Sequence, residues 1–256
     1  MPRRKPELPP PAAQSVTCVS DLLGLLMGAR SSGEVRWYRG QIDFEWKLEP
    51  ALARRAKFIE NEVQLLKLFR KDALSRVLQR PQTEWEWIVL AQHHGLPTRL
   101  LDWSENPLIG LYFAVEVDRS TDAAGPTDGA LFELDPLELN RAAYPDAKGV
   151  MMLDVDEELS AYLPNTPKPT HQKPVAVTAG RTFDRITAQS GTFTVTHRSH
   201  VPLESESTPG CLRKVRVPAA SKAAIRAELS DMNINASTVY PDLASLAVHI
   251  KEGHGR

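Results

Sequence analysis

The chain has 256 residues, 42% hydrophobic and 25% charged, a composition typical of a globular protein with a sizeable core. Its 31 Lys and Arg nearly balance its 32 Asp and Glu, so the formal net charge of -1 provides no overall field that would attract nucleic acid or anionic lipid. Two distant cysteines, Cys18 and Cys211, exclude a disulfide framework and a cysteine-based zinc cluster.

Proline and charge dominate residues 1–14, which predicts a disordered tail, and residues 251–256 are expected to form a second, flexible tail. Prolines stand where a signal peptide would carry its apolar region, and no apolar run approaches the roughly 18 residues of a membrane span. We therefore expect a cytoplasmic protein without a membrane partner. Residues 15–250 show no repeat and no linker, so one domain is expected.

In the first third of this domain, the pattern of apolar residues predicts a helix, a strand and a second helix. Apolar residues over 22–27 favour a short helix, and 35–39 alternate as a strand that Gly40 stops. From Phe58 to Leu78 apolar residues recur at helical spacing without Gly or Pro, which predicts one long amphipathic helix.

A second helix is predicted to begin at a Thr83 cap and to run to His93 and His94, where Gly95 and Pro97 stop it. The chain is then expected to continue as a tight loop, and the apolar run 108–117 is expected to be a close-packed helix.

The remaining chain alternates strands and helices, with a weakly periodic segment at 135–172 that we interpret as an insertion or lid. The expected strands are 129–134, 174–177, 189–193 and 211–217, and the expected helices are 221–229 and a terminal helix after 240–243. These elements predict an α+β fold, with a small mixed or antiparallel sheet flanked by helices in a single domain.

The most unusual stretch runs from Gln92 to Pro107. His93 and His94 are adjacent, so on a helix they point about 100° apart and are not expected to share a metal ion. Either they pack and cap the helix end, or one contacts a ligand. Arg99 and Asp102 either pair with each other or line a ligand site, and Trp103 is expected in the core.

Arg39 is the strongest candidate for binding an anion, because it ends a strand beside Gly40 and Gln41 and its guanidinium can hold phosphate or carboxylate with two hydrogen bonds. The sequence has no common phosphate-binding loop, serine-hydrolase elbow or zinc-protease helix. Their absence argues against a nucleoside-triphosphate machine, a common serine hydrolase and a zinc protease.

These motifs resemble the FRG domain family over about residues 15–250. The resemblance rests on Tyr38-Arg39-Gly40-Gln41, on the stretch from Gln92 to Pro107, on Phe113-Ala114, on Arg185 with Gln189, Gly191 and Phe193, and on Tyr240-Pro241-Asp242-Leu243.

A more distant resemblance is to ADP-ribosyltransferases that use an Arg, Ser and Glu trio. It implies that Arg39 holds the NAD pyrophosphate and that Ser104 orients the nicotinamide ribose. Gln189 would stand where these enzymes have glutamate, and an amide cannot supply the anionic stabilisation that an oxocarbenium-like state favours.

Taken together, the resemblances imply an ADP-ribosyltransferase-like cleft that takes NAD as substrate, needs no metal, and serves as an NAD-dependent transferase or NAD glycohydrolase in a bacterial toxin or phage-defence setting. The acceptor would be a protein or RNA. Arg39, Ser104 and Gln189 would be catalytic; Gly40, Gln41, His93, His94, Arg99, Asp102 and Arg185 would bind substrate. The alternatives are a non-catalytic module that recognises a nucleotide, RNA or protein, and a domain in which the motif residues only hold the fold. If the cleft exists, Ser104 should lie near Arg39 and Gln189.

Overall fold

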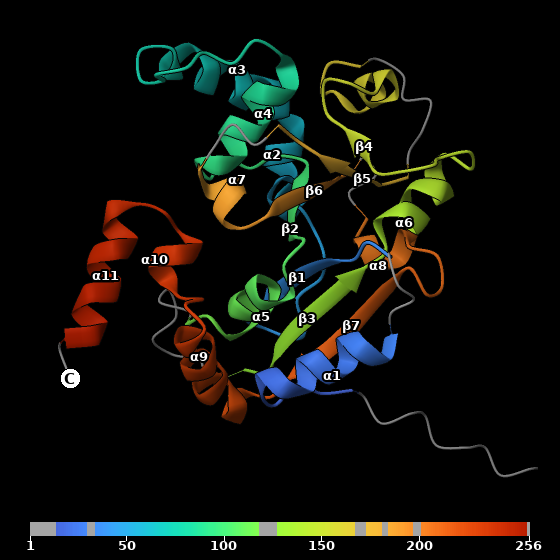
Figure 1. The fold of residues 1–256 in the computed structure, drawn as a ribbon. Coiled ribbons are helices and arrows are strands. Elements are labelled where there is room, and N and C mark those ends of the chain that lie inside the picture. The colour runs from blue at the N-terminus through green and yellow to red at the C-terminus, as the bar shows by residue number, and fades with distance from the viewer. Residues whose placement is uncertain are drawn as a thin grey trace, which may run out of the picture.

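A seven-stranded sheet organises the computed structural model, with strand order β4-β5-β6-β2-β1-β3-β7 (Figure 1). The structure describes residues 14–29, 34–117, 127–166, 173–180, 184–196 and 201–254. All neighbouring strands are antiparallel except β4 and β5. The strands are β1 (Trp37–Gln41), β2 (Leu100–Ser104), β3 (Gly129–Leu134), β4 (Met151–Met152), β5 (Val175–Thr178), β6 (Gly191–Val195) and β7 (Leu212–Val217).

Helices and short 3-10 turns surround this sheet, which confirms the α+β prediction. They are α1 (Val19–Ala29), η1 (Ala51–Arg54), α2 (Ala56–Glu60), α3 (Glu62–Ala73), α4 (Glu84–His93), α5 (Pro107–Val115), α6 (Pro136–Ala143), η2 (Glu157–Tyr162), α7 (Asp184–Ala188), α8 (Leu203–Glu206), η3 (Ala219–Ser221), α9 (Lys222–Asp231), α10 (Ala236–Val239) and α11 (Leu243–His254). None of the helices in the described ranges is long and apolar enough to cross a membrane.

Side chains on the two faces of the sheet belong to different hydrophobic clusters. On one face, α4 packs on β2, β5 and β6, while α1, α5 and α9 pack on β1, β3 and β7. On the other face, Trp37 and Trp103 lie with Leu48, Leu139 and Leu203 from outside the sheet. Because successive strand residues point to opposite faces, Arg39 shares the face of Trp37.

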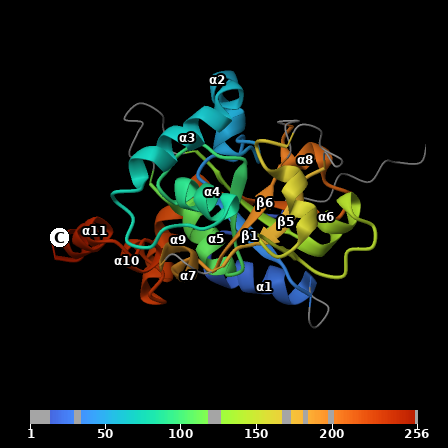
Figure 2. The same ribbon diagram turned by 90° about the horizontal axis from the view of Figure 1, so that it is seen from above.

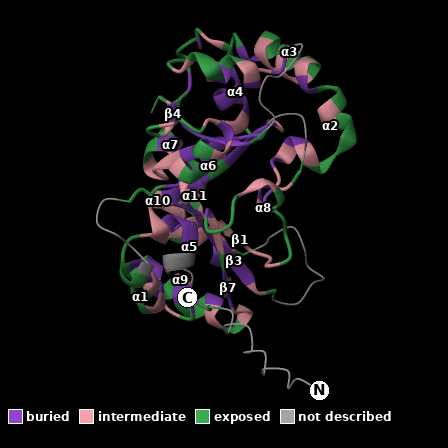
Figure 3. Cartoon of the chain, turned by 90° about the vertical axis from the view of Figure 1, so that its right-hand side faces the viewer, coloured by how far each residue is buried: buried purple, intermediate pink, exposed green. Residues whose placement is uncertain are grey.

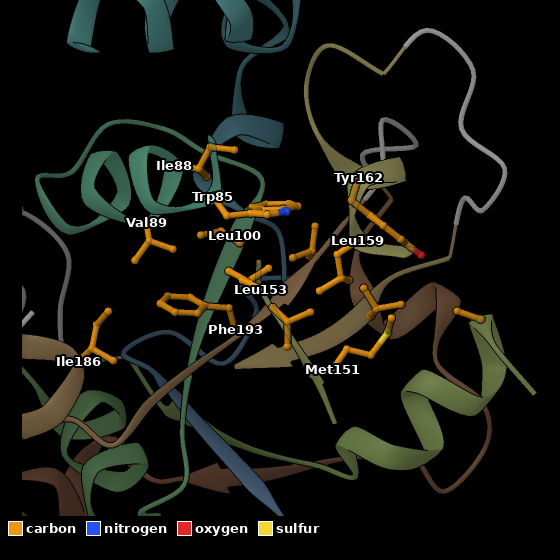
Figure 4. Packing of buried hydrophobic residues seen from close by; sticks show 14 residues of the cluster. Trp85, Ile88, Val89, Leu100, Met151, Leu153, Leu159, Tyr162, Ile186 and Phe193 are labelled. Atoms are coloured by element: carbon orange, nitrogen blue, oxygen red, sulfur yellow. The ribbon is translucent and has the colours of Figure 1, made fainter. Parts of the chain in front are cut away.

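The cluster beneath α4 joins sequence segments that are far apart. Figure 4 shows Trp85, Ile88 and Val89 of α4 above Leu100 and Phe193 of the sheet. The segment predicted as an insertion or lid also contributes here, because Leu159 and Tyr162 are completely buried. Buried residues follow the sheet and the inner sides of its helices, whereas α2 and α3 carry long exposed faces (Figure 3).

Only one residue pair, Tyr38 and Ser104, joins β1 to β2. By contrast, β2 pairs with β6 at five positions and β1 pairs with β3 at five. The sheet therefore consists of two well-paired groups of strands that meet at one narrow junction, and the motif residues lie on both sides of it.

Several predicted boundaries were wrong. The single helix over 58–78 is broken at Asn61, whose side-chain amide donates to the Lys57 carbonyl, and the second helix ends at Ala73. The tight loop predicted after Pro97 soon becomes strand β2, and Gln189 lies in a turn before β6 rather than on the strand. Most of the predicted tail at 1–14, and residues 255–256 of the other tail, lie outside the described residues.

Candidate functional site

Helix α4 positions the two histidines. Its start is a capping box in which the Thr83 hydroxyl accepts from the Glu86 amide and the Glu86 carboxylate accepts from the Thr83 amide. The helix ends at His93, and two residues later Gly95 has a φ of +79°, which is readily adopted only by glycine. The sequence thus fixes both ends of α4, and His93 falls on its last turn.

A hydrogen-bonded chain runs from this last turn to the middle of β2. The Thr98 hydroxyl donates to Gln92 Oε1 at 2.6 Å and accepts from the Leu100 amide at 3.1 Å. Gln92 Nε2 then donates to Asp102 Oδ2 at 2.8 Å. The loop that leaves α4 is therefore tied back to the helix, and the Asp102 carboxylate is oriented by this chain.

A small cavity of about 60 Å³ lies between α4, α7 and the strands β2 and β6. Its apolar side includes Val89, Ile186 and Phe193, all visible in Figure 4. Its polar side includes Gln92, His93, Asp102, Arg185 and Gln189; Trp103, Gly191 and Thr192 complete the wall. Four predicted site residues (His93, Asp102, Arg185 and Gln189) thus come together in one cavity.

A larger cavity, of about 500 Å³, lies elsewhere and is lined by 144–151 with Asp156 and Glu158. None of the predicted site residues lines it. The motifs therefore converge on the smaller cavity, which has room for one chemical group rather than for a whole nucleotide.

Arg39 reaches the edge of this site from the opposite face of the sheet. Its Nη1 donates to the Asp102 carbonyl at 2.5 Å, across the junction between β1 and β2. Its Nε is buried and has no hydrogen-bond partner in the described chain. The pKa of Arg39 is lowered by burial, an effect that the charge of Asp102 opposes and that of Arg54 increases. Arginine nevertheless remains protonated at neutral pH.

Gly40 and Gln41, the next residues on β1, have structural contacts. A Cβ on Gly40 would lie 2.1 Å from the Gly110 carbonyl oxygen and 2.2 Å from the Ala114 nitrogen, so α5 rests directly on the strand backbone. Gln41 is 4% exposed and donates to the Lys47 carbonyl. Neither residue lines the small cavity.

Ser104 joins the end of β2 to the turn before β6. Its hydroxyl donates to the Gln189 carbonyl at 2.6 Å and accepts from the Asn106 amide at 3.0 Å, and the residue is 3% exposed. The next residue in that turn, Ser190, has a φ of +46°, which is uncommon for a residue with a side chain. The Ser104 hydroxyl thus contacts Gln189, and the Ser104 backbone pairs with Tyr38, the residue before Arg39. The hydroxyl is already committed to the turn.

Gln189 and Arg185 connect the cavity to the C-terminal motif. Gln189 Nε2 donates to the Val239 carbonyl at 3.1 Å, and the Arg185 guanidinium carbon lies 4.9 Å from the Tyr240 ring centroid. Tyr240 also contacts Phe113 and donates to Glu116, and its pKa is raised by burial and by Glu116. The Gln-x-Gly-x-Phe and Tyr-Pro-Asp-Leu elements therefore lie side by side.

The two histidines have different surroundings. Their ring centroids are 4.8 Å apart in an edge-to-face arrangement, and His94 also lies 6.3 Å from the Phe69 ring. Burial lowers the pKa of His93, and the nearby charges of His94 and Arg185 lower it further. A neutral imidazole is therefore favoured in the cavity, while His94 lies outside it on the exposed helix end.

Arg99 does not lie in this cavity. It is 2% exposed, its Nε donates to Glu62 Oε1 at 2.7 Å, its Nη2 donates to Glu62 Oε2, and its Nη1 donates to the Tyr162 carbonyl at 2.6 Å. The predicted alternative of an Arg99–Asp102 pair is wrong, because Asp102 bonds to Gln92 instead. Trp103, predicted in the core, is 3% exposed.

Three residues at the site were not predicted as site residues: Gln92 and Thr98, which orient Asp102, and Arg54, whose charge affects Arg39. Gln92 and Thr98 belong to the stretch from Gln92 to Pro107, and their six-residue separation across a Gly-Pro loop is the only signal of their contact in the sequence. Arg54 was visible only as one of two adjacent arginines, and nothing in the sequence placed it near Arg39.

The comparison with family models finds the FRG domain at residues 34–123. This range contains β1, α4, β2 and α5, and ends before Arg185 and Gln189. No curated protein and no solved structure matches the chain. Residues 34–123 are therefore similar to the FRG domain, and this range holds Arg39, Asp102 and Ser104 at one junction of the sheet.

Proposed function

We propose that this FRG domain binds NAD or a related nucleotide at the β1–β2 junction and breaks the bond between nicotinamide and ribose, transferring ADP-ribose to a macromolecule or to water. The observation that carries the proposal is the contact between Arg39 Nη1 and the Asp102 carbonyl. The contact joins a charged fork, suited to a pyrophosphate, to the backbone of the residue whose side chain lines a polar cavity with His93 and Gln189.

The roles of individual residues follow from this arrangement. Arg39 would hold phosphate through the part of its guanidinium that does not contact Asp102, and the positive charge of Arg54 would strengthen that site. The small cavity would admit the nicotinamide or its ribose, with Arg185 and Gln189 on its wall. A toxin or phage-defence role would follow from NAD consumption or from modification of a protein or RNA.

The test uses NAD labelled separately in the nicotinamide and in the adenine, incubated with the protein and a cell lysate. Free labelled nicotinamide with labelled ADP-ribose indicates hydrolysis, and adenine label on a macromolecule indicates transfer. Arg39→Ala should abolish either product. Arg141→Gln is the matched control, because Arg141 is an exposed arginine on α6 that pairs with Glu138. No nicotinamide release by the native protein would refute the proposal.

A second candidate function is recognition of a nucleotide, RNA end or protein without catalysis. The observation in its favour is that the Ser104 hydroxyl and the Gln189 side chain already hydrogen-bond within the fold. A cavity of about 60 Å³ is also far smaller than the pockets of roughly 300–1,000 Å³ that enclose small ligands. Binding of a 5'-phosphorylated RNA that weakens steeply with salt, without nicotinamide release, would favour this function.

A further inference from the structure

Asp102 is the only acidic residue among the described residues that line the small cavity. The position expected to hold a glutamate is occupied by Gln189, whose amide cannot accept a proton and whose Nε2 already donates to the Val239 carbonyl. If this cavity supports a reaction that needs a carboxylate, Asp102 is the residue able to provide it.

Asp102 occupies an unusual place for an aspartate. β2 lies inside the sheet between β1 and β6, and Asp102 is the one exposed residue of that strand. Aspartate is disfavoured in strands because its short polar side chain competes for backbone hydrogen bonds. Its register opposite Phe193, another cavity residue, directs the side chain to the cavity face.

The carboxylate is held in place on one side only. Oδ2 accepts from Gln92 Nε2 at 2.8 Å, and Gln92 is fixed in turn by the Thr98 hydroxyl. Since Thr98 donates to Gln92 Oε1, the Gln92 amide must present its NH₂ group to Asp102. Oδ1 has no hydrogen bond within the described ranges, so one oxygen is oriented and the other can accept a proton.

The backbone carbonyl of Asp102 contacts Arg39, the residue proposed to bind phosphate. This carbonyl accepts from Arg39 Nη1 at 2.5 Å, so the guanidinium and the carboxylate belong to opposite sides of one residue. A dinucleotide whose phosphates bind Arg39 would reach the Asp102 carboxylate through the junction where β1 and β2 separate beyond the Tyr38–Ser104 pair, and binding energy at the phosphates would then position the reacting carbon.

We propose that Asp102 is the catalytic carboxylate of this site, stabilising the positive ribosyl centre and accepting the proton of the water that attacks it. This inference rests on the proposed function. The bond between C1' and the nicotinamide nitrogen breaks, its electron pair leaves with neutral nicotinamide, and water forms the new C1'–O bond. The proton of that water passes to Asp102 Oδ1 and then to solvent, which gives ADP-ribose, nicotinamide and one proton without any redox change.

The experiment measures nicotinamide release from NAD by the full chain. Asp102→Asn should lower kcat by roughly 100-fold or more with little change in KM, because general-base catalysis contributes about 10²–10⁴-fold. Asp231→Asn is the matched control, because Asp231 is an exposed residue at the end of α9. Melting temperatures of both variants show whether they fold.

A second variant separates catalysis from structure. In Asp102→Ala, added formate can occupy the vacated place and accept the proton, so formate should restore at least tenfold of the lost rate. Formate should not accelerate the native protein or Arg39→Ala. Loss of activity without formate rescue would assign Asp102 a structural role and overturn the inference.

The outcomes also separate this inference from the proposed function. A native protein that releases nicotinamide while Asp102→Asn keeps a rate within threefold of it refutes the role of Asp102 and leaves the function intact. A native protein that releases no nicotinamide refutes the function, and the role of Asp102 with it.

Discussion

Arg99 illustrates how a motif residue can serve the fold rather than the site. It lies three residues before Asp102 in sequence, yet its guanidinium turns away to the Glu62 carboxylate and the Tyr162 carbonyl. This ion pair connects the first turn of α3, the loop before β2 and the end of η2. Both charged side chains are at least nine-tenths buried, so each depends on the other for its hydrogen bonds.

Arg99→Met should destabilise the protein by about 3–5 kcal/mol, because it leaves the Glu62 carboxylate buried without a counter-charge. Urea unfolding of the two proteins measures this difference. The double variant Glu62→Leu/Arg99→Met should recover most of the loss, since it removes both charges. A single variant within about 1 kcal/mol of the native protein would show that the pair contributes little.

His93 should titrate below the ordinary histidine value of 6.5, because burial and the charges of His94 and Arg185 lower its pKa. NMR titration of the imidazole signals measures this directly. Arg185→Gln should raise the pKa of His93 toward 6.5, whereas the distant Arg141→Gln should leave it in place. An unchanged pKa in Arg185→Gln would place the charge of Arg185 too far away to matter.

The same shift makes stability depend on pH. Because the folded state binds the His93 proton more weakly than the unfolded state, the stabilisation is complete above about pH 6.5 and decreases as the pH falls below that value. His93→Gln should therefore lose less free energy of unfolding than the native protein between pH 7.5 and pH 5.5. Equal losses in both proteins would contradict this account.

The positions of single residues could be predicted from the sequence where their immediate neighbours in the chain determined them. Arg39 was correctly predicted on a strand, but β1 continues through Gly40 to Gln41 instead of ending at Arg39; Trp103 was correctly predicted in the core. The partner of Arg99 was predicted wrongly and that of Gln92 was not predicted, because both depend on how α3 and α4 pack against β2. That packing has no local signature in the sequence.

Helix α5 lies unusually close to strand β1. Gly40 and Gly110 face each other, so the helix backbone meets the strand without side chains between them. This close contact explains both the glycine at position 40 and the small residues Gly110 and Ala114 on α5. Arg39 is thereby held on a strand whose position the helix fixes.

Gly40→Ala should destabilise the protein by at least about 1–3 kcal/mol, because its methyl group would overlap backbone atoms that cannot move without shifting α5. Gly24→Ala is the matched control in helix α1, where a Cβ would meet no atom within 4 Å. It should stabilise the helix by about 0.5–1 kcal/mol. Thermal and urea unfolding compare the two, and similar stability in both would contradict the close contact.

Elements with strong local signals were predicted well. The capping box and Gly95 fixed both ends of α4, and the strands expected at 129–134 and 174–177 are present as β3 and β5. The break at Asn61 was missed, because its cause is a side-chain hydrogen bond that competes with the helix. α6 and η2 were missed as core elements, because their buried residues are sparse in sequence and become a core only against the sheet.

The order of strands in the molecule was beyond sequence reasoning. Residues 37–41 and 212–217 lie on the same three-stranded side of the sheet, although most of the chain separates them. Only contacts of long sequence separation determine this order, and no periodicity reports them. The contact between Ser104 and Gln189 was nevertheless expected, because the family resemblance supplied long-range information.

The C-terminal helices differ in how they attach to the molecule. α10 packs near α7 and provides Val239 and the Tyr240 contacts, whereas α11 lies at the periphery in both views (Figures 1 and 2). Leu243, Leu246 and Ile250 of α11 are 83%, 42% and 51% exposed.

A chain ending after Asp242 should keep its free energy of unfolding within about 1 kcal/mol of the full chain, because α11 contributes little to the described core. A chain ending after Ile234 should lose roughly 2–5 kcal/mol, since it removes the buried Val239 and the Tyr240 contacts with Arg185 and Glu116. Urea unfolding ranks the three chains. Equal stability of both truncations would contradict the attachment of α10.

We propose that the β1–β2 junction binds NAD through Arg39, and calorimetric titration of NAD into the protein measures this binding. The native protein should bind NAD, and Arg39→Gln should bind it at least about tenfold more weakly, because a charge-assisted phosphate contact contributes roughly 1.5–3 kcal/mol. Arg141→Gln should bind as the native protein does. Equal affinity of Arg39→Gln and the native protein, or no binding by either, would contradict the claim.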